Sequence, residues 1–174
     1  MTVTIDGTTG VSLVQDGVIT DANLPAGSVL QVVSTTKNNV FSTSSTSFTD
    51  VTGLSVSITP SSASSKILVL VNVMLGSTAD AGIKVQRGST DIAIGTGSSA
   101  FNCLGQSAPA PDDGLTYAPQ HSSISHLDSP STTSATTYKI QGRTNGSGTL
   151  YINRRAIADS FIGASSITLM EIAG

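Results

Sequence analysis

The segment Lys66–Leu75 reads KILVLVNVML and constrains the fold more than any other part of the chain. Branched or large apolar residues recur at every second position, and the run lies between Pro60 and Gly76. Alternation of this kind is typical of a β-strand. Because the intervening positions are also apolar, apart from Asn72, both faces of the strand need cover. We therefore predict the central strand of a sheet, with a buried helix as the alternative.

The composition around this strand favours an all-β protein of one domain. Charged residues make up 11% of the 174 residues, against about a quarter in an average soluble chain. Glu171 is the only glutamate, and lysine and arginine are also scarce, so the usual surface residues of helices are missing. The net charge of −3 offers no basic surface for nucleic acid or anionic membrane, so we predict no nucleic-acid partner. The apolar runs are shorter than the ~20 residues of a membrane helix, so we predict no membrane insertion.

The first 27 residues differ from the rest and contain a faint repeat, Val3–Gly7 against Leu13–Gly17, each ending in Asp-Gly. Asp-Gly favours tight turns, so short extended pieces are expected here, and these cannot form a core alone. We predict that residues 1–27 form an extended anchor and residues 28–174 the main domain; a flexible tail is the alternative. The anchor residues expected to be buried on the domain, another copy or a larger particle are Val3, Ile5, Val11, Leu13, Val14, Val18 and Ile19.

The rest of the chain reads as a succession of short strands separated by turns. The longest stretch without periodicity is Gly105–Gln120, predicted to be a loop suited to binding. Asn145-Gly146 between two alternating segments predicts a β-hairpin. Eight to ten strands with no helix indicate an antiparallel β-sandwich, which we predict to be of the jelly-roll type. The predicted strands are 28–34, 54–58, 66–75, 83–87, 91–95, 100–104, 122–127, 137–143, 149–152 and 166–172, with a short polar stretch around Val40, Phe41 and Phe48.

No residue pattern points to catalysis, so we predict a protein that is not an enzyme and needs no cofactor or metal. Asp112 and Asp113 are adjacent, and in an extended chain they would point to opposite sides. His121 and His126 are five positions apart, which also places them on opposite faces of a strand. Copies of one histidine could still meet on a symmetry axis. Cys103, the only cysteine, is expected to be a small buried apolar residue.

Five polar or aromatic residues are the candidates for surface recognition of a glycan or protein. They could equally be ordinary surface residues or contacts between subunits. These candidates are Tyr117, His121, Tyr151, Arg154 and Arg155.

Three longer phrases carry a resemblance to a known group of proteins. They are ITPSSASSKILVLVNV at 58–73, GTLYINR at 148–154 and SSITLMEIAG at 165–174, together with the opening VTIDGTTGVS. The sequence resembles a domain of virion structural proteins of tailed bacteriophages. The phrases are structural, so the resemblance implies a fold and a virion context, with no catalytic residue to transfer.

The resemblance implies a jelly-roll-like domain that assembles as a homotrimer. Such domains are displayed as short fibres, host-recognition tips or capsid decorations. The expected function is therefore a trimeric short tail fibre or adhesion tip, attached through its N-terminal segment to other virion proteins and able to contact a host glycan. A capsid decoration protein on the major capsid protein and a lectin-like module are the alternatives. The expected location is the virion, assembled in the host cytoplasm.

Overall fold

The computed structural model describes residues 24–97, 103, 105–107, 119–156 and 161–174, and for 105–107 the backbone alone. Within these residues the chain forms eleven strands and no helix. The predicted all-β class is confirmed. The strands are β1 (Val29–Lys37), β2 (Phe41–Thr43), β3 (Thr49–Ile58), β4 (Lys66–Ser77), β5 (Ala81–Arg87), β6 (Thr90–Ile92), β7 (Gly105–Ser107), β8 (Gln120–Asp128), β9 (Thr136–Thr144), β10 (Leu150–Ile152) and β11 (Ser165–Ile172).

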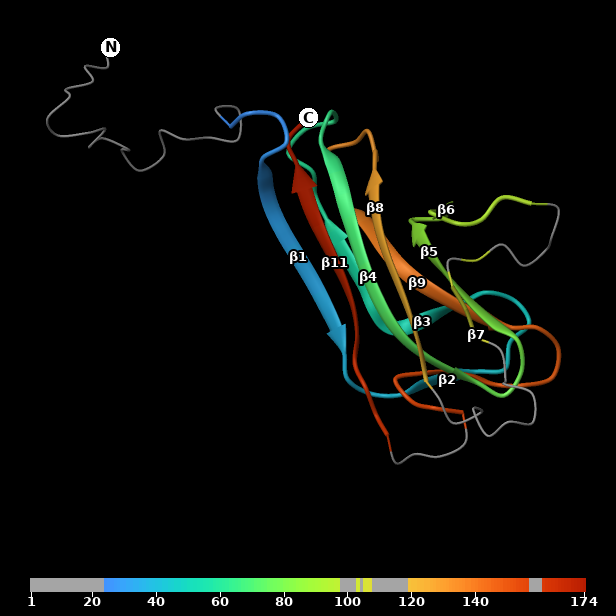
Figure 1. The fold of residues 1–174 in the computed structure, drawn as a ribbon. Helices are drawn as coiled ribbons and strands as arrows, with labels where there is room; N and C mark the ends of the chain where they lie inside the picture. The colour runs from blue at the N-terminus through green and yellow to red at the C-terminus, as the bar shows by residue number, and fades with distance from the viewer. Residues whose placement is uncertain (1–23, 98–102, 104, 108–118, 157–160) are drawn as a thin grey trace, which may run out of the picture.

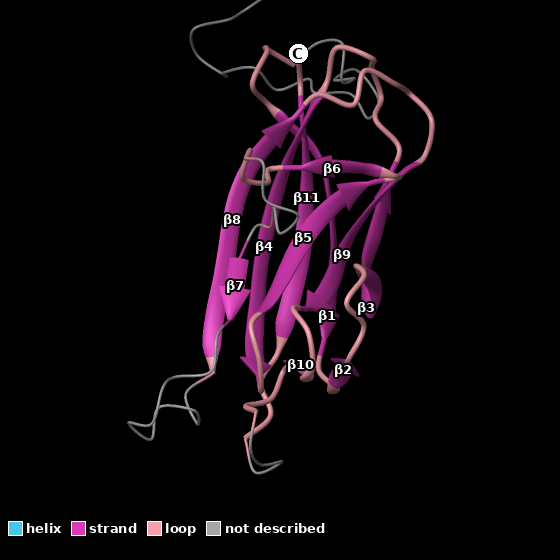
Figure 2. Ribbon diagram, turned by 90° about the vertical axis from the view of Figure 1, so that its right-hand side faces the viewer, coloured by secondary structure: helices cyan, strands magenta, loops and turns pink. Residues whose placement is uncertain are grey.

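The strands form two antiparallel sheets packed face to face (Figure 1). In the first sheet β1, β11, β4 and β8 lie side by side in that order. At the C-terminal end of β4 the sheet continues with β10 and then β2. In the second sheet the order is β3, β9 and β5, and the short β6 and β7 both pair with β5. Figure 2 shows the sandwich turned by 90°, with loops gathered at both ends.

The chain passes repeatedly from one sheet to the other, so strands that are neighbours in sequence are mostly not neighbours in space. The first sheet contains β1, β4, β8 and β11, and the second contains β3, β5 and β9. This interleaved antiparallel order is that of a jelly roll, so the predicted fold is confirmed.

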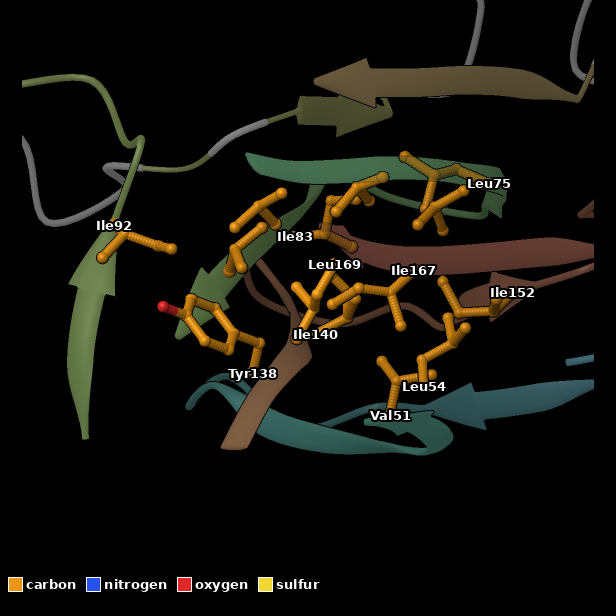
Figure 3. Close-up of a cluster of buried hydrophobic side chains, with 14 of the residues drawn as sticks. Val51, Leu54, Leu75, Ile83, Ile92, Tyr138, Ile140, Ile152, Ile167 and Leu169 are labelled. Atoms are coloured by element: carbon orange, nitrogen blue, oxygen red, sulfur yellow. The ribbon is translucent and has the colours of Figure 1, made fainter. Parts of the chain in front are cut away.

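The predicted central strand is β4, which pairs with β11 and β10 on one side and with β8 on the other. Its odd-numbered residues, including Ile67, Val69 and Val73, are fully buried and point between the sheets. They meet Leu54, Ile83 and other side chains of the second sheet in one continuous core (Figure 3). Burial of this cluster is the main force that holds the two sheets together.

The predicted hairpin at Asn145-Gly146 is wrong. β9 belongs to the second sheet and β10 to the first, where β10 pairs with β2 and β4. Gly146 has a φ of 85°, but the φ of Asn145 is not positive. A type I′ turn needs a positive φ at both central residues, so this turn, which closes a two-residue hairpin, does not form. The turn instead carries the chain between sheets, and the Asn145 amide donates to the Asp80 carbonyl at 2.7 Å.

Other local predictions had mixed outcomes. The strands predicted at 83–87 and 91–95 are present as β5 and β6, which pair as a hairpin around Gly88, although β6 ends at Ile92. The loop predicted at 105–120 is partly wrong, because residues 105–107 form β7 on the edge of β5 and Gln120 begins β8. The predicted strand at 100–104 lies outside the described residues except for Cys103, which is not in a strand.

The seven predicted anchor residues, between positions 3 and 19, lie outside the described residues. The described chain enters the first sheet just after the predicted boundary, where the Gly27 amide donates to the Ala173 carbonyl at 2.8 Å. The division at residue 27 stays a prediction.

Candidate functional site

The outer face of the first sheet is the surface that differs most from an ordinary exposed sheet. Alternate residues of β1, β11, β4 and β8 point away from the core and form this face. Sixteen residues point outward on β4 between Lys66 and Met74 and at the register positions beside them on β11, β1 and β8. Lys66 is the only one of these sixteen that carries a formal charge. We call this the uncharged face. It consists of Val32, Ser34 and Thr36 on β1, Ser166, Thr168, Met170 and Ile172 on β11, Lys66, Leu68, Leu70, Asn72 and Met74 on β4, and His121, Ser123, Ser125 and Leu127 on β8.

An apolar row crosses the upper part of the uncharged face, where upper refers to the orientation of Figure 1. The strand register places Val32 beside Met170, Met170 beside Leu68, and Leu68 beside Leu127. The two ends of the row, Val32 and Leu127, are each 54% exposed. Four apolar side chains in register across four strands form a continuous apolar strip rather than scattered surface residues.

Below the apolar row, hydroxyl and amide groups dominate the uncharged face. The Ser34 and Thr168 hydroxyls hydrogen-bond to each other at 2.9 Å across β1 and β11. Lower still, Asn72 Oδ1 lies 3.3 Å from His121 Nδ1 across β4 and β8. Hydroxyl groups both donate and accept, so this part of the face can bond to a copy of itself as readily as to water.

The outer face of the second sheet is different, because charged side chains lie along it in pairs. Asp50 and Lys139 form an ion pair at 2.9 Å, and Lys84 and Asp91 form another at 2.7 Å. Hydrogen bonds from Gln141 and then Lys139 lower the pKa of Asp50 below its ordinary value. Charged, salt-bridged side chains of this kind are typical of a sheet face in water.

Phe48 adds an aromatic ring to this charged side. Lys84 Nζ lies 4.5 Å from the centre of the Phe48 ring, and the Arg143 guanidinium lies 5.6 Å from it. These are cation–π contacts, and Lys84 itself is buried, with 9% of its surface exposed.

Three of the five predicted recognition residues come together at the lower end of the first sheet. Tyr151 lies on β10 opposite Gly76, and the Arg154 guanidinium stacks 4.1 Å from the centre of the Tyr151 ring. Arg155 follows and stacks 4.5 Å from the Phe161 ring. The Arg154 guanidinium therefore occupies one face of the Tyr151 ring, which a sugar would otherwise use for stacking.

The segment that carries the two arginines runs directly across the sheet. A Cβ atom added to Gly76 would collide with the Arg154 carbonyl oxygen and lie 2.9 Å from the Ala156 amide nitrogen. One added to Gly163 would collide with Met74 Sδ. The chain thus covers the lowest part of the outer face with its own backbone and leaves the apolar row above it exposed.

The remaining two candidates are separate from this group. His121 lies on β8 opposite Met74, with its side chain exposed on the uncharged face. Tyr117 lies outside the described residues. His126 points to the other side of β8, so the two histidines lie on opposite faces as their spacing predicts. Within the described ranges no group of three His, Cys, Asp or Glu side chains is placed to hold a metal ion.

Cys103 is half-buried rather than fully buried, and burial raises the pKa of its thiol above the ordinary value. A raised pKa keeps the thiol protonated near neutral pH and makes it a poor nucleophile. The described residues include no helix long and apolar enough to cross a membrane.

Sequence reasoning missed a polar cluster that joins the two sheets. Asp128 at the end of β8 accepts a 2.7 Å hydrogen bond from the fully buried Tyr138 hydroxyl on β9. The Arg87 guanidinium of β5 lies 2.8 Å from both oxygens of the same carboxylate. Burial and then the bond to Asp128 raise the pKa of Tyr138 far above its ordinary value. The cluster is structural, and only pairing across the sheets reveals it.

Asn153 is a second residue that sequence reasoning missed. It is fully buried with a φ of 67°, a conformation that asparagine tolerates better than most residues. Its side-chain amide donates to the Lys37 carbonyl at 2.7 Å, and its Oδ1 accepts a short hydrogen bond from the Ser165 hydroxyl. Asn153 therefore fixes the ends of β1, β10 and β11 to one another.

Comparison with known proteins gives structural matches with low scores. No protein-family model matches the sequence, and no curated protein matches it significantly. Two similar solved structures are from infectious bursal disease virus. The Gx strain structure has a TM-score of 0.36 and 14% identity, covering 83% of this chain and 36% of that chain. The VP2 subviral particle has a TM-score of 0.35 and 15% identity, covering 83% of this chain and 38% of the other. This chain thus spans little more than a third of either viral chain.

Proposed function

We propose that this protein is a non-enzymatic structural protein of a virion, which works as a homotrimer in a short tail fibre or adhesion tip. The observation that carries the proposal is the contrast between the two outer faces of the sandwich. The outer face of the second sheet carries two ion pairs, of which Lys139–Asp50 is the more exposed, whereas the strands of the first sheet present one charge among sixteen outward residues. Depletion of charge is typical of surfaces that are buried between subunits.

The resemblance to tailed-phage virion proteins supports the virion context of this assembly. It includes β4 and β11, which are the two middle strands of the uncharged face. In the proposal residues 1–27 attach the trimer to a tail or baseplate protein. Tyr151, Arg154 and Arg155 are the described candidates for contact with a host glycan, whereas His121 lies on the uncharged face. Individual glycan sites are weak, and three linked copies would gain avidity of ~100-fold or more.

The experiment is to locate the protein in particles and to measure its assembly. Purified virions are separated into heads and tails, and the fraction that contains the protein is identified by mass spectrometry. The expected result is its presence in tails, with a light-scattering mass three times the 17.6 kDa of one chain for the isolated protein. Its absence from particles would refute the virion role.

A capsid decoration protein on the head shell is the second candidate. Finding the protein in the head fraction would select this alternative. In either case deletion of residues 1–27 is expected to abolish incorporation into particles while leaving the thermal unfolding of residues 28–174 unchanged. Unchanged incorporation would refute the anchor.

A further inference from the structure

The upper part of the outer face of the first sheet is exposed, although its side chains suit a buried interface. The apolar row of Val32, Met170, Leu68 and Leu127 lies on four adjacent strands, with more than half of the surface of the two end residues in solvent. Among the described residues, 154–156 cover the same face near Gly76, and Gly163 covers it near Met74. The apolar row and the hydroxyl rows below it are left without a partner among the described residues.

From this geometry we infer that the uncharged face is the surface through which copies of this chain contact one another. The inference deepens the proposed function and rests on it, because it names the surface through which the proposed oligomer forms.

The near absence of charge on this face limits the kind of surface that can bind to it. A partner with a charged surface would gain nothing from this face, because it offers only Lys66, whose Nζ lies 2.9 Å from the Ser129 hydroxyl. A surface of the same uncharged kind can be covered without desolvating paired charges. The sequence contains few charges in all, and within the described residues the outer face of the second sheet holds Asp50, Lys84, Asp91, Lys139 and Arg143. The uncharged face itself is therefore the best-matched partner that the structure offers.

The residues below the apolar row can form hydrogen bonds with a partner surface. Ser34, Thr168, Leu70 and Ser125 lie at one level across β1, β11, β4 and β8, and the three hydroxyls can each donate and accept. The Ser34 and Thr168 hydroxyls already hydrogen-bond to each other, so burial leaves neither without a partner. A partner surface that carries hydroxyl groups can also bond to Ser125, whereas an apolar partner would leave Ser125 unsatisfied at a cost of about 1–3 kcal/mol.

The area of the uncharged face indicates how strongly the copies would associate. A face of four strands about 4.8 Å apart and about seven residues long covers roughly 450 Å² in projection on each copy. The total of about 900 Å² is below the roughly 1,200–2,000 Å² of stable specific interfaces and is in the range of weak, transient ones. We therefore expect the isolated protein to associate at micromolar concentration, and the anchor to add contacts within a particle.

The test is a labelling experiment on the full-length chain in a Cys103→Ser background. Leu127→Cys places a thiol at the end of the apolar row, and Ser57→Cys places one on the exposed outer face of the second sheet. Both positions are exposed in the single chain, so both variants are expected to fold, which circular dichroism checks. Maleimide labelling rates are measured over a dilution series, with sedimentation velocity on the same samples.

We expect the Leu127→Cys thiol to react at least tenfold more slowly at associating concentrations than after dilution, while the Ser57→Cys rate stays constant. Equal rates at all concentrations in a protein that sediments as an oligomer would overturn the inference, because another surface would then form the contact. Slow labelling that persists in the diluted monomer would also overturn it, since residues of the same chain would then cover the face. A monomer at every concentration up to 1 mM, on the order expected for weak interfaces, overturns it as well.

A second pair of variants repeats the test without cysteine. Leu127→Asp puts a charge into the proposed interface, and Ser57→Asp puts the same charge on the other sheet. We expect the first to shift the association midpoint upward by at least tenfold and the second to leave it unchanged; equal midpoints would overturn the inference.

The outcomes separate this inference from the proposed function. Slow labelling in a dimer would support the uncharged face and refute the homotrimer. Overturning of the face by the labelling data would leave the virion role intact, because that role is tested by the presence of the protein in purified particles.

Discussion

Glu171→Gln is the substitution that tests most directly how polar groups hold the jelly roll together. Glu171 is fully buried on β11, and its carboxylate accepts hydrogen bonds from Gln31 Nε2 at 2.5 Å and from the amide and hydroxyl of Ser61 at 2.7 Å each. All three donors are neutral. They connect β11 to β1 and to the loop before β4, so one side chain holds three separate segments of the chain.

The expected cost follows from the number of acceptors that remain. Glutamine keeps one carbonyl oxygen, so either the Gln31 amide or the two Ser61 donors would face an NH2 group that cannot accept. A hydrogen bond to a charged group contributes about 1.5–3 kcal/mol, and a buried donor left without an acceptor costs about 1–3 kcal/mol. Because the surrounding loop can relax in part, we expect a loss of about 3 kcal/mol in the free energy of unfolding at pH 7.

The sign of the pH dependence follows from the pKa of Glu171. Burial acts to raise this pKa, but hydrogen bonds from Gln31 and Ser61 outweigh burial and hold the pKa below its ordinary value of 4.5. The folded state therefore binds this proton more weakly than the unfolded chain does. The ionised carboxylate stabilises the fold above about pH 4.5, and this contribution is lost as the pH falls through the lowered pKa.

Urea unfolding of the wild type and Glu171→Gln at equal protein concentration, at pH 7 and at pH 3, measures both effects. The difference between the two proteins is expected to be full at pH 7 and smaller at pH 3. Asp50→Asn is the matched control, because the Asp50 side chain is 57% exposed and its ion pair should contribute less than about 1 kcal/mol. A Glu171→Gln deficit of equal size at both pH values would refute the role of the ionised carboxylate.

Two further substitutions test packing at other points. Asp128→Ala removes the acceptor shared by Arg87 and the buried Tyr138 hydroxyl, and we expect a loss of about 3 kcal/mol in urea unfolding. Gly76→Ala places a methyl group against the Arg154 carbonyl oxygen, and overpacking against backbone is expected to cost about 2 kcal/mol in the same assay.

Each of these has a control from the same part of the molecule. Asp91→Ala removes a more exposed carboxylate of the second sheet and should cost less than about 1 kcal/mol. Gly95→Ala adds the same methyl group in open space, where no atom lies within 4 Å, and should cost less than about 1 kcal/mol. Losses as large as those of Asp128→Ala and Gly76→Ala would show that the named contacts are not the cause.

The sequence predicts those features of the fold that depend on local alternation. The run at Lys66–Leu75 is apolar on both sides, and β4 does lie in the middle of the first sheet. The bounds of β5, β9 and β11 also agree with the alternation to within a few residues. The alternation within one strand shows which of its side chains are buried, and it can be seen in the sequence of that strand alone.

Features that depend on the partner of a strand could not be predicted in the same way. Asn145-Gly146 has the composition of a hairpin turn, yet β9 and β10 belong to different sheets. β10 pairs with β4 instead, and its residues Leu150 and Ile152 are part of the core between the sheets. The contacts of Asp128 with Arg87 and of Asn153 with Lys37 likewise join residues 41 and 116 positions apart. No local pattern contains such pairings.

The candidate site shows the same division between local and distant information. Tyr151 and Arg154 are three positions apart in sequence and do stack, so their proximity could be expected from the chain alone. The apolar row could not, since Val32, Leu68, Leu127 and Met170 come from four strands and only the register aligns them.

The scarcity of charge in this chain acquires a physical meaning from its distribution over the two sheets. A sandwich that works alone needs polar or charged outward residues on both sheets, because two exposed apolar rows would promote aggregation. Here the second sheet meets that need with Asp50, Lys84 and Lys139, whereas the outward positions of β4 begin Lys66, Leu68, Leu70. Leucine at two successive outward positions of a central strand is unfavourable in water and favourable under another protein surface. The sequence of β4 is therefore better explained by a folded state in which its outer side is covered, and the labelling rate at Leu127 decides whether sister copies provide that cover.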